Sequence, residues 1–416
     1  MANFGDTVNT RRPGQFIGVR KVPADSVTVQ NATALNVQVP LNQHVHVSFL
    51  IKDGEESKSF KDLITEYMYP AMLAQARFLD QIVLGQWPQF IANQYGQLGT
   101  ISGTNIRSNI LGVRNKMNTN KAYFNDRNMI FTPNSETQAL QLDLFVAAQQ
   151  VGDDGTALRE ASLGRKLGFD MFMCQNASSV ASTATTSDAD TTTTALAAGA
   201  TSLVLTTGTS TSLVPGAWIT IAGDGTPLQV ATWTVATKTV TLNPATPVRT
   251  ATLTGAAVAI YKKTTVNQAV TPTGYAAGWS KEIVLASVAG LAVGQLISFS
   301  GDQTNWYTIL QVDTTGVGVV LDRPLVLAIA NGDNATPGPA GEFNFAFHRN
   351  ALALVCRPLS MPRPGTGALS AVVNWNDLSM RATITYQGTQ QGHLVTLDLL
   401  CGIAVLDTNL GCIMLG

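Results

Sequence analysis

A repeated pattern in the second half of the chain constrains its fold more than any other feature. The segment TSLVLTTGTSTSLVPGAWITIAGD (201–224) aligns with KEIVLASVAGLAVGQLISFSGD (281–302), and both run on to a Val/Thr strand and a proline, VTLNPATP and VVLDRPL. The matching positions are Gly216, Ile219, Ile221, Gly223 and Asp224 in the first copy, and Gly294, Ile297, Phe299, Gly301 and Asp302 in the second. Turns and inward positions at one offset predict a duplicated small β module, and two copies are too few for a solenoid.

The sequence on either side of the repeat differs in character. A Ser/Thr/Ala-rich stretch of low complexity precedes it and predicts a linker at 177–190. After residue 343 the segment SMRATITYQGTQQGHLVTLDLLCGIAVL alternates, with one face formed by Met380, Ala382, Ile384 and Tyr386. This alternation predicts a long hairpin whose turn is bounded by Gly388 and Gly392.

Helical spacing dominates the region before the linker. Leu63, Tyr67, Ala71, Phe78 and Ile82 predict a helix over 59–86, about 40 Å long at ~1.5 Å per residue. Pro70 lies inside this helix and should kink it.

Shorter helices and strands then alternate. We expect a helix at about 104–118 and a strand at 128–131. A second helix is expected at PNSETQAL, capped by Asn134 or Ser135. The strand expected at 169–174 is apolar throughout, which predicts cover on both faces. The chain is therefore predicted to be α+β.

Composition limits the classes of function. The chain has 416 residues, more than one hydrophobic core usually holds, and only 13 % of them are charged. Interface cores between proteins are depleted in charge, so this composition suits a chain that buries much of its surface against copies of itself. The net charge of −1 argues against a dedicated nucleic-acid binder.

The four cysteines, the N-terminus and the hydropathy profile indicate a location. Cys174, Cys356, Cys401 and Cys412 are widely spaced and predict buried thiols in a reducing compartment. The N-terminal residues lack the apolar core of a secretory signal, and no run of 18 apolar residues occurs.

Three segments resemble known catalytic or ligand-binding motifs but do not match them. In LGRKLGFDMFMCQN (163–176), Gly164 and Gly168 are one residue too close for a phosphate-binding loop, which predicts a turn before a strand. GTISG (99–103) has its serine one place late for a nucleophile elbow, and GDDG (152–155) lacks the spaced oxygens of a calcium loop.

The histidines do not indicate a site either. His44 and His46 share a strand face but lack a third metal ligand nearby, and His348 and His393 are isolated in the sequence. We therefore predict no catalytic, cofactor-binding or metal-binding residues, and no cofactor.

Several segments, in their order along the chain, carry a resemblance to a known family. They are FKDLITEYMYPAMLAQARFLDQ, RNMIFTPNSETQAL, GRKLGFDMFMCQN, GLAVGQLISFSG, NFAFHRNALALVCRPLSMP and SMRATITYQGTQQGHLVTLDLLCGIAVLD. Together they cover most of 59–176 and 281–407. In this order they resemble the major capsid (coat) proteins of tailed double-stranded DNA bacteriophages, which have the Hong Kong-97-type fold, in the subfamily with an inserted β domain.

The resemblance implies a layout. Residues 1–57 would form an N-terminal arm and extended loop, and 58–176 the first part of the shell domain with its spine helix. After the linker at 177–190, 191–262 and 263–346 would be two copies of the inserted β module. Residues 347–416 would return to the shell, completing peripheral and axial domains. The first copy, 191–262, departs from the family pattern, and the arm matches it only loosely.

The resemblance also implies a role and partners. The chain would be a structural protein that self-assembles, as hexamers and pentamers, into an icosahedral head around packaged double-stranded DNA. It would be found in the virion after assembly in the host cytoplasm. Scaffolding and portal proteins would be partners during assembly, DNA contacts would be non-specific, a decoration protein is compatible, and no membrane or enzymatic activity is implied.

Two other classes remain open from the residues alone. A phage tail-tube or fibre protein would share the Thr/Gly-rich β character, but it should lack the kinked helix and the helix–strand–helix block. An α+β enzyme would need a catalytic constellation, which the sequence does not offer.

Overall fold

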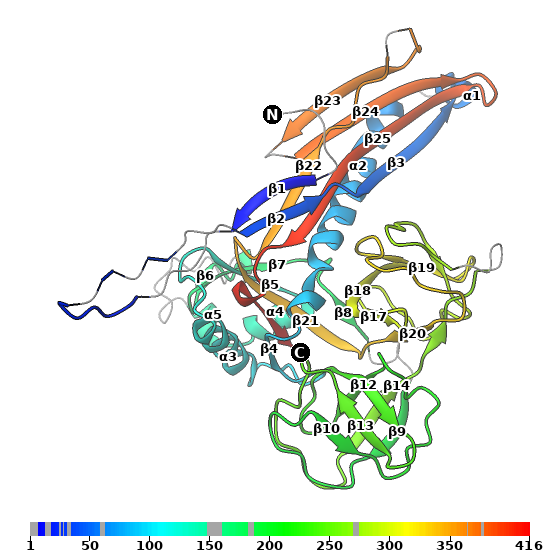
Figure 1. The fold of residues 1–416 in the computed structure, drawn as a ribbon. Coiled ribbons are helices and arrows are strands. Elements are labelled where there is room, and N and C mark those ends of the chain that lie inside the picture. The colour runs from blue at the N-terminus through cyan, green and yellow to red at the C-terminus, as the bar shows by residue number, and fades with distance from the viewer. Residues whose placement is uncertain are drawn as a thin grey trace. The chain divides into compact units, whose positions relative to one another are not determined.

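The computed structural model describes residues 7–12, 18–24, 26–27, 29–30, 35–58, 63–147, 160–181, 187–268, 274–363, 365–375 and 378–416. Internal contacts divide the chain into two compact units. The first comprises residues 1–75 and 352–406, and the second comprises 76–351 and 407–416. Figure 1 shows the elements of both units.

The first unit is built on an antiparallel sheet that includes the predicted hairpin. Its strand order is β22-β25-β24-β23, and β3 also pairs with β25. The strands are β3 (Gln43–Lys52), β22 (Leu352–Arg357), β23 (Leu369–Trp375), β24 (Leu378–Gln387) and β25 (Gly392–Val405). The long hairpin is confirmed: β24 and β25 pair from Arg381 opposite Asp398 to Gln387 opposite Gly392.

Part of the predicted arm belongs to this unit. Strands β1 (Thr7–Arg12) and β2 (Leu35–Pro40) pair with each other in antiparallel fashion. Val39 is fully buried, and a Cβ on Gly402 of β25 would collide with the carbonyl oxygen of Pro40. The expected arm (1–57) thus differs in its second half, because residues from about 35 onward contribute to this unit's own strands and core.

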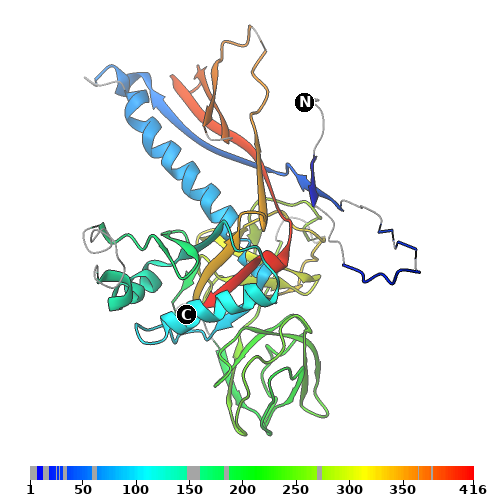
Figure 2. The ribbon, with the colours of Figure 1, turned by 90° about the vertical axis from the view of Figure 1, so that its left-hand side faces the viewer.

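The long helix is present as α2 (Leu63–Leu84), with Pro70 inside it, and follows the short helix α1 (Asp53–Glu56). Its 22 residues correspond to about 33 Å at ~1.5 Å per residue. Its buried positions include Ala71, Gln75, Leu79 and Ile82, whereas Tyr67 is 51 % exposed. The expected apolar stripe is therefore corrected: Tyr67 does not belong to the buried face. Figure 2 shows α2 from its side.

The second unit contains a mixed sheet in the order β4-β26-β21-β5-β7-β6, with β8 paired to β21. Its strands are β4 (Gln94–Gly96), β5 (Arg127–Phe131), β6 (Arg165–Lys166), β7 (Phe169–Met173), β8 (Ser179–Val180), β21 (Gly341–His348) and β26 (Gly411–Leu415). The helical segments are η1 (Trp87–Phe90), α3 (Ile106–Thr119), α4 (Pro133–Leu140), α5 (Asp143–Val146) and η3 (Thr408–Leu410). The helix–strand–helix block α3-β5-α4 is thus present as predicted.

Two details of this block differ from expectation. The cap of α4 is Thr132, whose Oγ1 accepts a hydrogen bond from the Ser135 backbone amide, and not Asn134 or Ser135. The reason is Pro133, which takes the first helical position and places the cap at Thr132, two or three residues before the predicted ones. Strand β7 is not covered on both faces, since Phe172 is 57 % exposed and Met173 is 41 % exposed.

The repeat region forms two six-stranded sheets with the same topology. The first has the order β10-β13-β12-β11-β14-β9, and the second, read in the same direction, has β16-β19-β18-β17-β20-β15. The first comprises β9 (Ser187–Thr191), β10 (Ser202–Val204), β11 (Trp218–Ile221), β12 (Leu228–Thr234), β13 (Thr239–Leu242) and β14 (Ala257–Tyr261). The second comprises β15 (Thr264–Thr265), β16 (Ile283–Val284), β17 (Leu296–Phe299), β18 (Asp302–Asp313), β19 (Gly318–Leu321) and β20 (Asn334–Pro337).

The likeness extends to irregular features. Each sheet closes on itself through an isolated bridge between its outer segments, Thr192 to Leu205 in the first and Val266 to Leu285 in the second. The register shifts at corresponding points, between Val230 and Thr232 in β12 and between Ile309 and Gln311 in β18. Each closed sheet surrounds its own cluster of buried apolar residues.

The residues that aligned in the two sequence copies hold matching places. Ile219 and Ile221 are buried on β11, as Ile297 and Phe299 are on β17. Gly216 and Gly294 both have positive φ, 88° and 83°. The range expected to be a linker, 177–190, contains β8 and the start of β9, so the first sheet begins at Ser187. None of the described helices is both long enough and apolar enough to cross a membrane.

Candidate functional site

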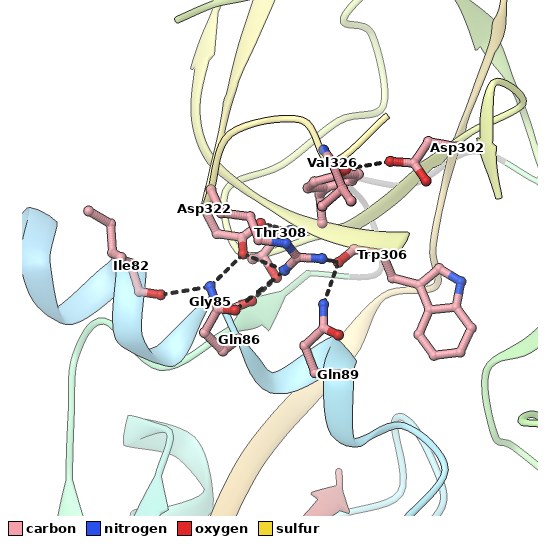
Figure 3. Close-up of polar contacts among 11 residues, drawn as sticks. Ile82, Gly85, Gln86, Gln89, Asp302, Trp306, Thr308, Asp322 and Val326 are labelled. Atoms are coloured by element: carbon pink, nitrogen blue, oxygen red, sulfur yellow. Dashed lines mark hydrogen bonds and ion pairs between the residues drawn. The ribbon is translucent and has the colours of Figure 1, made fainter. Parts of the chain in front are cut away.

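A buried polar network of the second unit lies where α2 ends (Figure 3). The Asp322 carboxylate accepts hydrogen bonds from Gln86 Nε2 at 2.7 Å, Arg323 Nη1 at 2.9 Å and the Thr308 amide at 2.7 Å. The Thr308 hydroxyl donates to the Gly85 carbonyl at 2.8 Å. The end of the helix is therefore attached to β18 and to the segment after β19 by the buried side chains of Gln86, Thr308 and Asp322.

The close approach of the end of α2 to Asp322 depends on Gly85. A Cβ there would lie 2.7 Å from Asp322 Cβ and 2.8 Å from the Gln81 carbonyl oxygen. Burial raises the pKa of Asp322 to about 6, although the adjacent Arg323 guanidinium acts in the opposite direction. Burying a charged acid costs solvation free energy, but its hydrogen bonds hold the surrounding segments in place. Such acids occur at structural junctions as well as in catalytic sites.

The two closed sheets are joined by a second polar contact. The indole Nε1 of Trp218 on β11 donates to Ser298 Oγ on β17 at 3.0 Å. Ser298 Oγ in turn donates to the Gly216 carbonyl at 2.9 Å, and Thr336 Oγ1 donates to the same carbonyl at 2.8 Å. Trp218 also packs edge-on against Trp306, with ring centroids 5.8 Å apart. One of the positions that define the repeat, Gly216, therefore lies at the contact between its two copies.

The glycine-bracketed turn has no features of a phosphate loop. Lys166 Nζ donates to the Leu163 carbonyl at 2.9 Å, and Arg165 pairs with Asp170 at 3.7 Å. Gly164 and Gly168 have positive φ at either end of β6, which pairs with β7. The turn-and-strand interpretation of this segment is confirmed, and its cations are bound within the turn itself.

The histidine pair on β3 forms no metal site with other described residues. His44 and His46 have ring centroids 6.1 Å apart. The nearest carboxylate to His44 is that of Asp398, at 3.9 Å, and this carboxylate already forms a bidentate contact with Arg381.

His393 is isolated in the sequence, but in the structure it lies close to two carboxylates. Its ligand atom lies within 4.8 Å of carboxylate oxygens of Asp53 and Glu56, a set that could hold a metal ion. Tyr386 donates a hydrogen bond to Asp53 at 2.8 Å beside it. No local pattern in the sequence indicates this cluster, because its members lie on α1 and on β25, the second strand of the hairpin.

The remaining motifs supply no chemistry. Ser102 of GTISG lies in the loop before α3, where its amide donates to Asn105 Oδ1 at 2.8 Å. GDDG (152–155) lies outside the described residues. Over the part of the chain that the structure describes, no hydrogen bond joins a histidine to a serine, threonine or cysteine; His348 Nδ1 accepts from the Asn350 amide.

Exposed large apolar side chains occur on both units, and the first unit has a set of eight on two of its parts. They lie on the exposed face of α2 and on strands β23 and β24. They are Tyr67, Tyr69, Met72, Leu73, Leu369, Val373, Leu378 and Tyr386. Groups of exposed apolar side chains often mark contacts with protein partners.

Comparison with known proteins gives distant structural matches. No protein-family model matches the sequence, and no curated protein is detectably similar to it. A solved structure from Mycobacterium phage Che8 aligns with 99 % of this chain and 84 % of its own, at 9 % identity and a TM-score of 0.42. The capsid structure of the cyanophage P-SCSP1u aligns with 99 % of this chain and 83 % of its own, at 9 % identity and a TM-score of 0.45.

A third match is the asymmetric unit of the bacteriophage PhiM1 mature capsid, which aligns with 99 % of this chain and 82 % of its own, at 8 % identity and a TM-score of 0.38. All three TM-scores lie below 0.5. The chain is thus similar over its length to solved phage structures, at a distance where its function has to be inferred from its own residues.

Proposed function

We propose that this chain is a non-enzymatic major capsid protein that self-assembles into the icosahedral head of a tailed bacteriophage. The observation that carries the proposal is the exposed apolar surface of the first unit, on α2, β23 and β24. It occurs in a chain with only 13 % charged residues. Exposed apolar side chains and a low charge density are both typical of surfaces that contact other proteins, and in a shell the contacts would be with copies of this chain.

The arrangement of elements supports the same role. The segments that resemble the capsid family correspond to the long helix α2, the block β5-α4, the turn β6-β7, and the strands β21, β22, β24 and β25. A tail-tube or fibre protein should lack α2 and the block α3-β5-α4. An enzyme should bring reactive groups together, and the near-miss motifs do not.

Finer parts of the proposal follow from the resemblance. Hexamers and pentamers of this chain would enclose double-stranded DNA, with scaffolding and portal proteins taking part in assembly. The two closed sheets, 187–261 and 264–337, would be duplicated copies of the inserted β module. Their common strand order and common bridges support the duplication.

Assembly tests the proposal directly. The purified full-length chain, alone and co-expressed with a scaffolding protein, should form closed shells in negative-stain micrographs and sediment as a large particle. A stable monomer over a wide concentration range in both preparations would overturn the proposal. Open tubes would favour the tail-tube alternative.

A pair of matched variants locates the interface. Val373 lies on β23, the outer strand of its sheet, and is 61 % exposed, whereas Val235 lies after β12 and is 71 % exposed. Val373→Glu should leave the chain folded but block assembly, because it places a charge in an apolar contact. Val235→Glu introduces the same charge outside that surface and should assemble normally. Equal assembly of both variants would exclude β23 from the interface.

A further inference from the structure

A cavity in the second unit is lined largely by polar side chains from separate segments of the chain. It has a volume of about 410 Å³, and its lining includes Gln94, Asn109, Lys116, Thr226, Arg249 and Thr250. These residues come from β4, α3 and the loops of the first closed sheet. The cavity therefore lies at the junction between the mixed sheet and that closed sheet.

Two cations line this cavity. Lys116 forms no ion pair with any carboxylate among the described residues. Arg249 Nη2 donates to the carbonyls of Ala92 and Ala245, at 3.0 and 3.2 Å, but its Nε is buried with no described partner. Burial raises the pKa of the Cys412 thiol to about 12, and both cations act against that shift, so both influence the same point in the interior.

The nearest acid does not neutralise both charges. Asp224 Oδ1 accepts hydrogen bonds from the amides of Arg249 and Thr250, at 2.7 and 2.5 Å, and its Oδ2 accepts from the Thr226 hydroxyl. Its oxygens are thus occupied by groups of its own sheet. The lining of the cavity contains two cations and no carboxylate, which leaves a net positive cavity.

A buried amide provides an independent indication of a ligand. Gln94 is 4 % exposed, and neither its Nε2 nor its Oε1 has a hydrogen-bond partner among the described residues. An unpaired buried amide is costly, and native proteins usually satisfy such groups with a bound molecule or water. Gln94 lines the same cavity as the two cations.

We propose that this cavity binds a phosphate-type oxyanion between Lys116, Arg249 and Gln94. Ammonium, guanidinium and amide N–H groups are the donors that phosphate oxygens accept most strongly. Such an anion would tie β4 and α3 to the first closed sheet, beside the contacts from Gln97 Nε2 to the Gly223 carbonyl and from the Leu98 amide to the Gly225 carbonyl. The site is independent of shell assembly.

Calorimetric titration of the unassembled full-length chain with potassium phosphate, against potassium chloride at equal ionic strength, tests the proposal. We expect saturable binding of phosphate and a rise in Tm with phosphate concentration. Lys116→Met should weaken binding at least tenfold. Arg107→Met removes a positive charge from the exposed part of the same helix, outside the cavity, and should leave the affinity unchanged.

A second variant tests whether phosphate binding depends on this cavity or only on the overall charge of the chain. Gln94→Leu keeps every charge, so it should raise the Tm of the phosphate-free chain and yet weaken phosphate binding severalfold. If a short DNA duplex competes with phosphate, the ligand is a phosphate of the DNA backbone. If the duplex does not compete, the ligand is the free phosphate ion. Absence of phosphate binding, equal effects of Lys116→Met and Arg107→Met, or unchanged affinity in Gln94→Leu would each overturn the proposal.

Discussion

The side-chain amide of Gln86 donates a 2.7 Å hydrogen bond to the carboxylate of Asp322, which follows it by 236 positions in the chain. Gln86 is the second residue after α2, and Asp322 directly follows β19 of the second closed sheet. This sheet is thus attached to the end of the long helix by a fully buried charge. Its attachment should respond to pH and to small changes in packing.

Replacing Asp322 with asparagine should change how stability depends on pH. The folded-state pKa of about 6 lies above the ordinary 3.8, so the folded chain binds more protons between these values than the unfolded chain does. This group therefore lowers the free energy of unfolding as pH rises from about 4 to 6, by about 3 kcal/mol in total. Urea titrations across this range should show that fall in the natural chain and not in Asp322→Asn. The prediction would be contradicted if the free energy of unfolding changed with pH in the same way for both proteins.

Gly85→Ala should destabilise the chain by about 1–3 kcal/mol, since the added methyl group would overpack the contact with Asp322. The matched control is Gly54→Ala, because a Cβ on Gly54 meets no atom within 4 Å. Thermal unfolding of both variants provides the comparison. Equal Tm values would mean that the helix end moves aside without cost.

Trp218→Phe should weaken the contact between the two closed sheets by about 1–3 kcal/mol, through loss of the indole hydrogen bond and of buried volume. Trp279, which is 37 % exposed, provides the control substitution to phenylalanine, with an expected effect of about 0.5 kcal/mol or less. Chemical denaturation followed by circular dichroism measures both. A larger effect at Trp279 would place the weak point elsewhere.

Cys401 and Cys412 should resist alkylation in the folded chain. Both thiols are fully buried, and burial raises the pKa of each to about 12, so almost no thiolate is present at pH 8. Peptide mapping after brief iodoacetamide treatment should find Cys174, which is only partly buried, modified first, and all four modified after unfolding in urea. Early modification of Cys412 would mean that β26 opens readily.

Removal of residues 187–261 should leave the rest of the second unit folded, since the first closed sheet has a core of its own. The expected cost is limited to the contacts of this sheet with neighbouring segments, which include those of Trp218, Gly223, Gly225 and Arg249. Circular dichroism and a cooperative melt of the shortened chain test this expectation. Loss of cooperative unfolding would show that the two sheets are stable only together.

Local patterns in the sequence predicted the features that depend on local interactions. The repeat was visible because Gly216 and Gly294 each start the same turn-and-strand sequence, and the hairpin because its alternation continues to Gly388. The predicted helix cap, Asn134 or Ser135, lies two or three residues after the observed one, since Thr132 directly precedes the proline that begins the helix.

Features that depend on distant residues could not be predicted. β9, with the sequence SDADT, has a composition unlike that of a strand, yet its Asp190 is satisfied by the amides of Thr207 and Gly208. The oxyanion cavity combines Gln94, Lys116 and Arg249, which no short motif links. The partners of such residues are set by the tertiary fold, about which neighbouring letters carry no information.

The strand order of the closed sheets has a consequence for how such a chain can grow. In each sheet the first strand pairs directly with the last, β9 with β14 and β15 with β20. The chain therefore enters and leaves each sheet at neighbouring positions, about 5 Å apart, the spacing of paired strands. A host loop needs to open by only one strand's width to accept such a sheet. A gene could thus gain a second copy in tandem without disturbing the scaffold that carries the first.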